Sequence, residues 1–344
     1  MADLLASPIA SNVVVALLVL GAIFLWRAVS RNRIWSEAMR SVYRRRPIAA
    51  WVCALYLSIG LCDSVAWVGG QQVGADTVAS HEAKTLLDRA FGDTKEKSYS
   101  APFASAEFYA KSALKHPGSH VLGTDILGRD VLFVTLKGVR IALLIGGLTS
   151  LIAIPLALLM GVLAGYFGKR IDDAVFFVVS VLQSMPSILL LIALITALPK
   201  STLSVCLALA VTSWVGFCRL SRGETMKLRE LDYVHAARAL GVSEWRIIWR
   251  HILPNLTHLI VITFALSFSA LVLSEAVLAW LNIGVDGSWG QMIAQAKSEL
   301  SREPVVWWNL TAAGTALFVL LLVINLLGDA IRDVLDPRTA RERQ

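Results

Sequence analysis

Long runs of apolar residues constrain this chain more than any other feature of its sequence. A run of about 18 or more apolar residues can cross the hydrocarbon core of a bilayer as a helix. Hydrophobic residues make up 56% of the 344 residues and charged residues only 17%, which is more apolar than an ordinary soluble chain. The runs predict an all-α membrane protein, a polytopic helical bundle of seven spans, of which the first and fifth are rather short. The predicted spans are residues 11–26, 47–68, 136–167, 174–198, 202–217, 257–281 and 307–327.

The positions of arginine and lysine predict how the spans are oriented, because cytoplasmic loops carry an excess of both. Segments 27–46 and 219–250 each carry seven basic residues, and the tail 331–344 carries four. Seven spans place all three segments on one face, so we expect a cytoplasmic C-terminus and an extracytoplasmic N-terminus. The chain begins Met1-Ala2-Asp3 without a basic residue, which favours an uncleaved first helix over a signal peptide.

The predicted spans and the segments between them suggest four parts. Residues 1–46 form an extra N-terminal helix with an arginine-rich cytoplasmic linker. Residues 47–135 form the first core span and a long extracytoplasmic loop, in which the spacing of apolar residues predicts a short helix around 81–91. Residues 136–330 form the core, with a cytoplasmic hairpin at 221–255, and residues 331–344 form a cytoplasmic tail. The net charge of +7 lies between spans, so it indicates a membrane surface rather than nucleic acid.

The hairpin segment has the pattern of two helices separated by a glycine. Apolar residues and alanines favour a helix over 230–240, and Gly241 is typical of a residue that ends one. Ser243 is a suitable N-cap for a second helix over 244–252, which we expect Leu253-Pro254 to end. Tryptophans and arginines alternate with isoleucines along this second helix. Such a surface suits either docking of a protein partner or an interfacial helix lying on anionic lipid.

Other residues at membrane depth also predict special features. Glu275 falls within the sixth predicted span, where an acid is costly and is either part of a pathway or gate or held by a structural partner. Pro155 and Pro186 lie inside predicted spans and are expected to kink them. Residues 120–130, with two glycines and four polar side chains, predict a structured turn at the membrane surface, with a ligand site as the alternative.

Several classes of function lack their sequence signals. The run at 166–170 lacks both the first glycine and the Ser/Thr of a phosphate-binding loop, so no nucleotide site is predicted. The four cysteines and six histidines form no metal-binding pattern. A secondary transporter predicts inverted repeats and several intramembrane charges. A membrane enzyme predicts a catalytic cluster at span depth. Neither pattern is present.

Three motifs, in order along residues 120–338, resemble a known family. Tyr233-Val234-His235-Ala236-Ala237-Arg238-Ala239-Leu240-Gly241, followed by Ile252-Leu253-Pro254, is similar to the Glu-Ala-Ala ("EAA") loop of binding-protein-dependent ABC importer permeases. Gly123-Thr124-Asp125 through Gly128-Arg129-Asp130 resembles a signature of the dipeptide, oligopeptide and nickel branch. The C-terminal run from Asn325 to Arg338 does so as well. His235 departs from the pattern, which usually has glutamate there, and the extra first span is also unusual for this branch.

The resemblance implies a type I ABC importer permease fold and a division of labour among subunits. It implies a second homologous permease, two ATPase subunits that bind ATP and Mg, and an extracytoplasmic binding protein. This chain would be a non-enzymatic transport subunit of the bacterial inner membrane, with peptides as cargo and nickel or another small solute as the alternative. The residues that it implies for coupling to the ATPases are His235, Ala236, Ala237, Gly241, Ser243, Glu244, Trp245, Arg246, Trp249, Arg250, Leu253 and Pro254, with 242–250 as the coupling helix.

Overall fold

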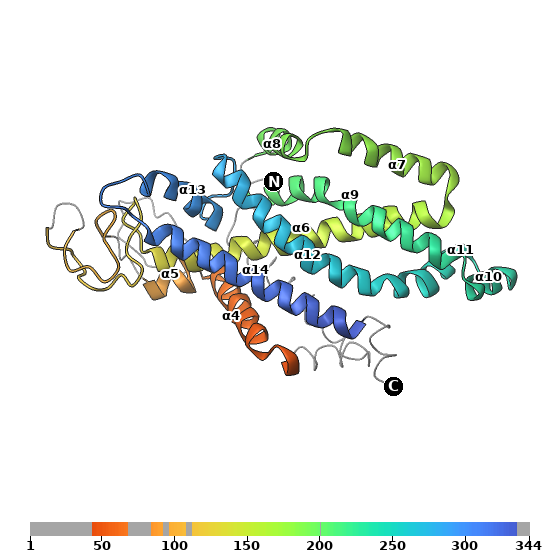
Figure 1. Ribbon diagram of the computed structural model, residues 1–344, viewed down its shortest axis with the longest axis horizontal. Coiled ribbons are helices and arrows are strands. Elements are labelled where there is room, and N and C mark those ends of the chain that lie inside the picture. Colours follow the sequence, from red (N-terminus) through yellow and green to blue (C-terminus); the bar gives the residue numbers. More distant parts are fainter. Residues whose placement is uncertain (1–42, 68–83, 92–95, 108–111, 200, 336–344) are drawn as a thin grey trace, which may run out of the picture.

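The computed structural model describes residues 43–67, 84–91, 96–107, 112–199 and 201–335. Four long helices run side by side along the longest axis, and α4 (Pro47–Ser64) packs obliquely against two of them (Figure 1). The four are α6 (Val131–Phe167), α9 (Thr202–Arg229), α12 (Leu253–Trp280) and α14 (Trp308–Leu335). Within the described residues, five helices are long and apolar enough to span a membrane, or six if a bent pair counts as one span. The predicted span 11–26 lies outside the described residues, so the count of seven remains a prediction.

The fourth predicted span, 174–198, is a broken helix and not a continuous one. The structure contains α7 (Lys169–Ser184) and α8 (Ser187–Ala197), bent by 91° at the break between them. Pro186 lies at this break, where its missing N–H and its ring disfavour a continuous helix. The expected kink at Pro186 is therefore confirmed as a full break, whereas α6 continues past Pro155.

Helix α6 is the centre of the bundle and packs most extensively against α9. Gly161 and Gly165, four residues apart, allow the two backbones to approach closely, as small residues do in membrane helix pairs. A Cβ on Gly161 would lie 2.6 Å from the carbonyl oxygen of Cys218, and one on Gly165 would lie 2.6 Å from that of Arg222. This packing lies beyond residue 217, where the fifth predicted span ends.

The helices therefore extend further than the predicted spans. Residues 221–229, predicted as the start of the hairpin segment, instead continue α9 to Arg229, and Ser221 and Thr225 there are buried. An apolar run predicts only the part of a helix that lies in the hydrocarbon core. The helix itself continues as long as its backbone hydrogen bonds and its packing are maintained. The described chain thus has two ends, which we call the hairpin end, around residues 232–252, and the loop end, around residues 84–130 (Figure 1).

The loop end contains short elements. Strands β1 (Ala66–Trp67) and β2 (Lys84–Thr85) pair antiparallel, and α5 (Leu86–Phe91) follows directly. The helix predicted around 81–91 therefore begins only at Leu86, because residues 84–85 are held in the strand pair; residues 81–83 lie outside the described chain. The Thr85 hydroxyl accepts a hydrogen bond from the Asp88 N–H at 3.2 Å, as an N-cap does.

Helix α13 (Trp289–Glu299) also lies at the loop end and carries a buried acid whose titration should affect stability. Burial raises the pKa of Glu299, and the nearby Asp125 charge raises it further, whereas the Asn309 amide and Arg302 lower it. A raised native pKa means that the folded state holds this proton more tightly than the unfolded state. Protonated Glu299 therefore contributes its full stabilisation of the fold at pH values below its unfolded-state pKa. This contribution is lost as the pH rises through its native-state pKa.

We therefore expect Glu299→Gln to remove this pH dependence while keeping a hydrogen-bond acceptor for Asn309. The variant and the unmodified protein should unfold at similar temperatures near pH 4.5, and the variant should be the more stable of the two near pH 8. Thermal unfolding in detergent at both pH values measures this. A variant that is less stable at pH 8 than the unmodified protein would contradict the prediction.

Candidate functional site

The hairpin lies at one extreme of the molecule and consists of α10 (Asp232–Ala239), a turn at Gly241, and α11 (Glu244–Ile247) (Figure 1). Gly241 has φ of +77°, a left-handed conformation that glycine adopts without steric cost. Its N–H bonds to the Arg238 carbonyl at 3.0 Å, and the Val242 N–H bonds to the Ala237 carbonyl at 3.1 Å. These two bonds form a Schellman motif. The predicted helix, glycine, helix pattern is confirmed.

The second hairpin helix does not end at Leu253-Pro254, as the sequence had suggested. Helix α11 passes through a π-helical turn, η1 (Ile248–Ile252), directly into α12, so residues 244–280 form one continuous element. The wider turn lets the Leu253 N–H bond to the Ile248 carbonyl and places Pro254 in the first turn of α12, where its missing N–H costs little. Ser243 occupies the N-cap position of α11, but its side chain makes no capping bond.

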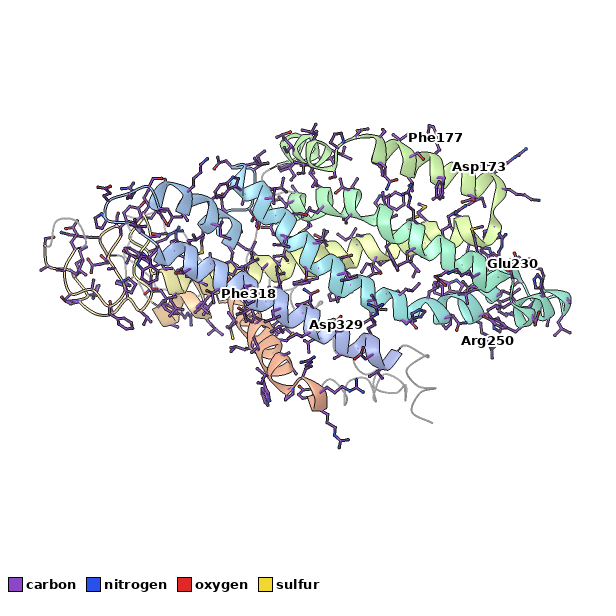
Figure 2. All side chains as sticks on the ribbon, viewed as in Figure 1. Asp173, Phe177, Glu230, Arg250, Phe318 and Asp329 are labelled. Atoms are coloured by element: carbon purple, nitrogen blue, oxygen red, sulfur yellow. The ribbon has the colours of Figure 1, made fainter. Side chains whose placement is uncertain are left out.

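The hairpin buries aliphatic side chains and exposes aromatic and charged ones. Val234, Ile247, Ile248 and Ile252 are at most 3% exposed and pack with the end of α6. Outward-facing residues include Trp245, Trp249 and Leu240, which are 56%, 70% and 84% exposed, and the exposed Arg246 and Arg250. Figure 2 shows Glu230 and Arg250 at this end of the molecule. The result is a surface of apolar and cationic groups without a covering element among the described residues.

The EAA-like residues themselves are at the surface of α10. His235 and Ala236 are exposed, and Ala237 is half-buried. The His235 Nε2 lies 3.6 Å from Glu230 Oε2, and both side chains are more than half exposed. An exposed pair of this kind contributes little to stability, and α10 runs unbroken through His235.

Three side chains tie the hairpin to α6, and we call them the Tyr166 clamp: Tyr166, Arg238 and Glu244. The Arg238 guanidinium donates to the Tyr166 hydroxyl at 3.2 Å and pairs with Glu244 Oε1 at 3.3 Å. The Tyr166 hydroxyl donates to Glu244 Oε2 and is part of a side chain only 4% exposed. The clamp thus joins α10, α11 and the end of α6 in one network. Sequence reasoning missed it, because no spacing rule links residues 166, 238 and 244.

Removing the clamp hydroxyl should loosen the hairpin without unfolding the bundle. Tyr166→Phe deletes one donor and one acceptor among charged partners, and we expect a loss of about 1–3 kcal/mol in local stability. Hydrogen exchange of residues 232–243 measures this, because exchange reports the free energy of local opening. Tyr233→Phe is the matched control, since its hydroxyl only accepts from Asn255 at 3.3 Å in an exposed pair. Equal exchange in the two variants would contradict a role for the clamp.

Glu275 lies on α12 near the loop end and is 3% exposed. Its carboxylate accepts a hydrogen bond from the Val285 N–H at 3.3 Å, which fastens the turn between α12 and α13. A carboxylate oxygen also lies 3.0 Å from the position that a Cβ on Gly290 would occupy. These contacts fit the structural alternative weighed for this acid, and a pathway or gate role remains a prediction.

A groove of about 320 Å³ opens between α8, α9 and α12. Aliphatic side chains form much of its wall, and hydroxyl groups from all three helices face it. The hydroxyl-bearing residues are Ser187, Thr212, Ser213, Ser267 and Ser274. The groove begins at the break between α7 and α8, and nothing in the sequence analysis pointed to it as a site.

At the loop end, residues 120–130 form a compact polar turn, as predicted. Asp130 accepts from the Leu132 N–H at 2.8 Å and so caps α6, while its other oxygen lies 2.8 Å from His120 Nδ1. Asp125 accepts from the Arg129 backbone and side chain. The Trp308 indole donates to the Thr124 carbonyl at 2.9 Å, which joins this turn to the start of α14. No cluster of metal-binding side chains occurs in the described part of the chain.

Comparison with known proteins identifies the family. The family described as "Binding-protein-dependent transport system inner membrane component" matches residues 157–341, more than half of the chain. This chain belongs to that family. The match includes the hairpin, the groove and Glu275, and it excludes the polar turn at 120–130.

Curated relatives from the family cover more of the chain. The glutathione transport system permease protein GsiD of Pectobacterium atrosepticum is 34% identical over 245 residues, 70% of this chain and 80% of that protein. The oligopeptide transport system permease protein OppC of Mycobacterium tuberculosis is 35% identical over 250 residues, 71% of this chain and 84% of that protein. A solved structure of the MetNI methionine ABC transporter in an inward-facing conformation aligns at 20% identity with a TM-score of 0.49, over 60% of this chain and 98% of that chain.

Membership of the family confirms the resemblance drawn from the three motifs, and with it a multi-pass membrane permease. The structure brings most of the predicted hairpin residues together at the hairpin end. Leu253 and Pro254 are instead the first two residues of α12, where the sequence had predicted a helix end. Glu275 lies apart from them, toward the opposite end of α12. The permease fold thus separates an exposed hairpin from a buried acid and a polar turn at the loop end.

Proposed function

We propose that this chain is the permease subunit of an ATP-driven importer and forms half of the translocation pathway for peptides. The observation that carries the proposal is the exposed apolar and cationic hairpin, continuous with α12, on a member of a binding-protein-dependent transport family. Relatives named for oligopeptide, peptide and glutathione transport support peptides as cargo. Nickel or another small solute remains the alternative cargo.

The length of the helices favours a protein partner over lipid at the hairpin. Helix α6 has 37 residues, about 55 Å, which at a tilt of about 20° spans about 52 Å along the membrane normal. A whole bilayer with its headgroups is about 40–45 Å thick. A helix of this length extends past the headgroups, and we place the excess at the hairpin, where a protein surface would cover the exposed Trp249 and Leu240.

The proposed assembly is the one that the family resemblance implies. Two ATPase subunits, which bind ATP and Mg, dock on the cytoplasmic hairpin, and a second homologous permease completes the pathway. An extracytoplasmic binding protein delivers peptide at the loop end. Because residues 244–280 form one element, a movement of the docked ATPase passes along α12 without an intervening hinge. In this proposed arrangement the C-terminus lies in the cytoplasm and the N-terminus lies outside the inner membrane that holds the complex.

Purification of the tagged chain from its own cells in mild detergent tests the proposal. We expect a second permease and ATPases to co-purify, and peptide with binding protein to stimulate ATP hydrolysis in reconstituted vesicles. Stimulation by Ni²⁺ in place of peptide would move the assignment to the alternative cargo. A chain that purifies alone and transports without ATP would overturn the proposal.

Charge reversal at the hairpin tests the docking surface itself. Arg246→Glu with Arg250→Glu should weaken ATPase association and uncouple hydrolysis from transport, because both guanidinium groups are exposed on the proposed interface. Arg332→Glu is a matched control, since Arg332 is exposed near the end of α14 and lies outside the hairpin. Normal transport in the double variant would contradict the docking assignment.

A further inference from the structure

The groove between α8, α9 and α12 lies at the break in a membrane-spanning element. Irregular backbone at membrane depth is tolerated where it is buried in protein or lines a water-filled cavity, and such breaks accompany substrate sites in transporters. The residues beside the break, Ser187 and Ile188, are exposed and line the groove. The break between α7 and α8 therefore fits a groove that holds a polar medium or a ligand.

The hydroxyl groups of the groove are of two kinds. Thr212 and Ser274 donate to carbonyls of their own helices, as serine and threonine in membrane helices commonly do. The hydroxyl groups of Ser187, Ser213 and Ser267 make no hydrogen bond with any described residue, and none of the three residues is fully buried. Hydroxyl groups that face hydrocarbon without a partner are costly. Three such groups on three different helices, facing one groove, indicate a polar ligand between them.

The groove is lined by no charged side chain among the described residues, and this restricts the kinds of ligand that it can bind. The described residues that line it include no Asp, Glu, Lys, Arg or His. A transition-metal ion requires imidazole, thiolate or carboxylate ligands, and the groove offers none of them. A charged side chain would also find no counter-ion. Neutral hydroxyls can, however, donate to and accept from an amide, and every peptide presents an amide at each residue whatever its side chains are.

We propose that this groove is the wall of the translocation pathway and that it holds the peptide main chain through the hydroxyls of Ser187, Ser213 and Ser267. The inference rests on the proposed function and deepens it by naming the site and the feature of the cargo that the site contacts. It implies that the permease itself does not select among peptides by charge. Selection by charge then belongs to the other subunits.

A charge placed in the groove should create a selectivity that the unmodified groove lacks. The experiment uses the complete complex in vesicles with one binding protein, and it compares uptake of tripeptides that differ only in a central Lys, Ala or Glu. We expect Ser213→Asp to raise the Lys-to-Glu uptake ratio about tenfold over the unmodified complex, and Ser213→Lys to lower it by a similar factor. Ser184→Asp and Ser184→Lys are the controls, because Ser184 is an exposed serine just before the break that does not line the groove.

The outcomes separate the two proposals. Opposite changes of the ratio in the two Ser213 variants, absent from the Ser184 variants, support the groove, because a merely structural role would not respond to the sign of the charge. Unchanged ratios in Ser213 variants that still transport peptide overturn the groove and leave the proposed function intact. If both Ser213 variants fail to assemble, the same ratio measured with Ser267→Asp and Ser267→Lys decides. An unmodified complex that moves no peptide overturns the proposed function itself.

Discussion

Replacing Gly241 with proline is expected to abolish coupling between ATP hydrolysis and transport. Gly241 has φ of +77°, whereas proline fixes φ near −65°, and proline also removes the N–H that bonds to the Arg238 carbonyl. The Schellman turn that sets the angle between α10 and α11 cannot form. We expect a cost of about 3 kcal/mol or more to the hairpin conformation, with loss of peptide-stimulated hydrolysis. ATPase and uptake assays on the reconstituted complex measure this.

Two further substitutions at Gly241 separate conformation from volume. A Cβ at this position would meet nothing within 4 Å, so added volume is not the obstacle. Asparagine tolerates the left-handed conformation, and Gly241→Asn should keep most of the coupling, whereas Gly241→Val should lose most of it. Similar activity of the asparagine and valine variants would show that the backbone conformation at Gly241 does not govern coupling.

The sequence predicted the apolar spans and the hairpin because both depend on local pattern. Gly241 and the isoleucines at 247, 248 and 252 each follow a rule that a single helix or turn obeys. The ends of the helices were less predictable. Leu253-Pro254 reads as a helix end, yet a π-helical turn absorbs the proline, and no local rule in the sequence specifies that turn.

Features that depend on contacts between distant segments could not be predicted from one sequence. The Tyr166 clamp joins residues more than 70 positions apart. The groove lies between α8, α9 and α12, and we infer a ligand there from hydroxyl groups that have no hydrogen-bond partner among the described residues. Pro186 predicted a disturbance of the fourth span, but only the packed structure shows that the break coincides with the groove. The family resemblance pointed to the hairpin residues, but it pointed neither to the Tyr166 clamp nor to the groove.

The polar turn at the loop end should be highly sensitive to loss of Asp130, because this side chain has two structural roles. One oxygen caps α6 through the Leu132 and Phe133 N–H groups, at 2.8 and 3.3 Å. The other bonds to His120, whose ring is only 3% exposed. Asp130→Ala removes the cap, at about 1–2 kcal/mol, and leaves a buried imidazole without this partner, at about 1–3 kcal/mol.

We therefore expect Asp130→Ala to lose about 3 kcal/mol of stability. Asp130→Asn is the matched control: its oxygen still caps α6, and its amide can donate to the Nδ1 of a neutral His120. Global unfolding is measured on heating by the labelling of the buried Cys206 and Cys218 thiols with a thiol-reactive dye. Hydrogen exchange of residues 120–135 measures local opening of the turn. If the alanine variant matched the asparagine variant in both measurements, the turn would not anchor α6. If only exchange differed, the turn would open independently of the bundle, and the proposed docking of a binding protein at the loop end would then act on a locally mobile surface rather than on the spans themselves.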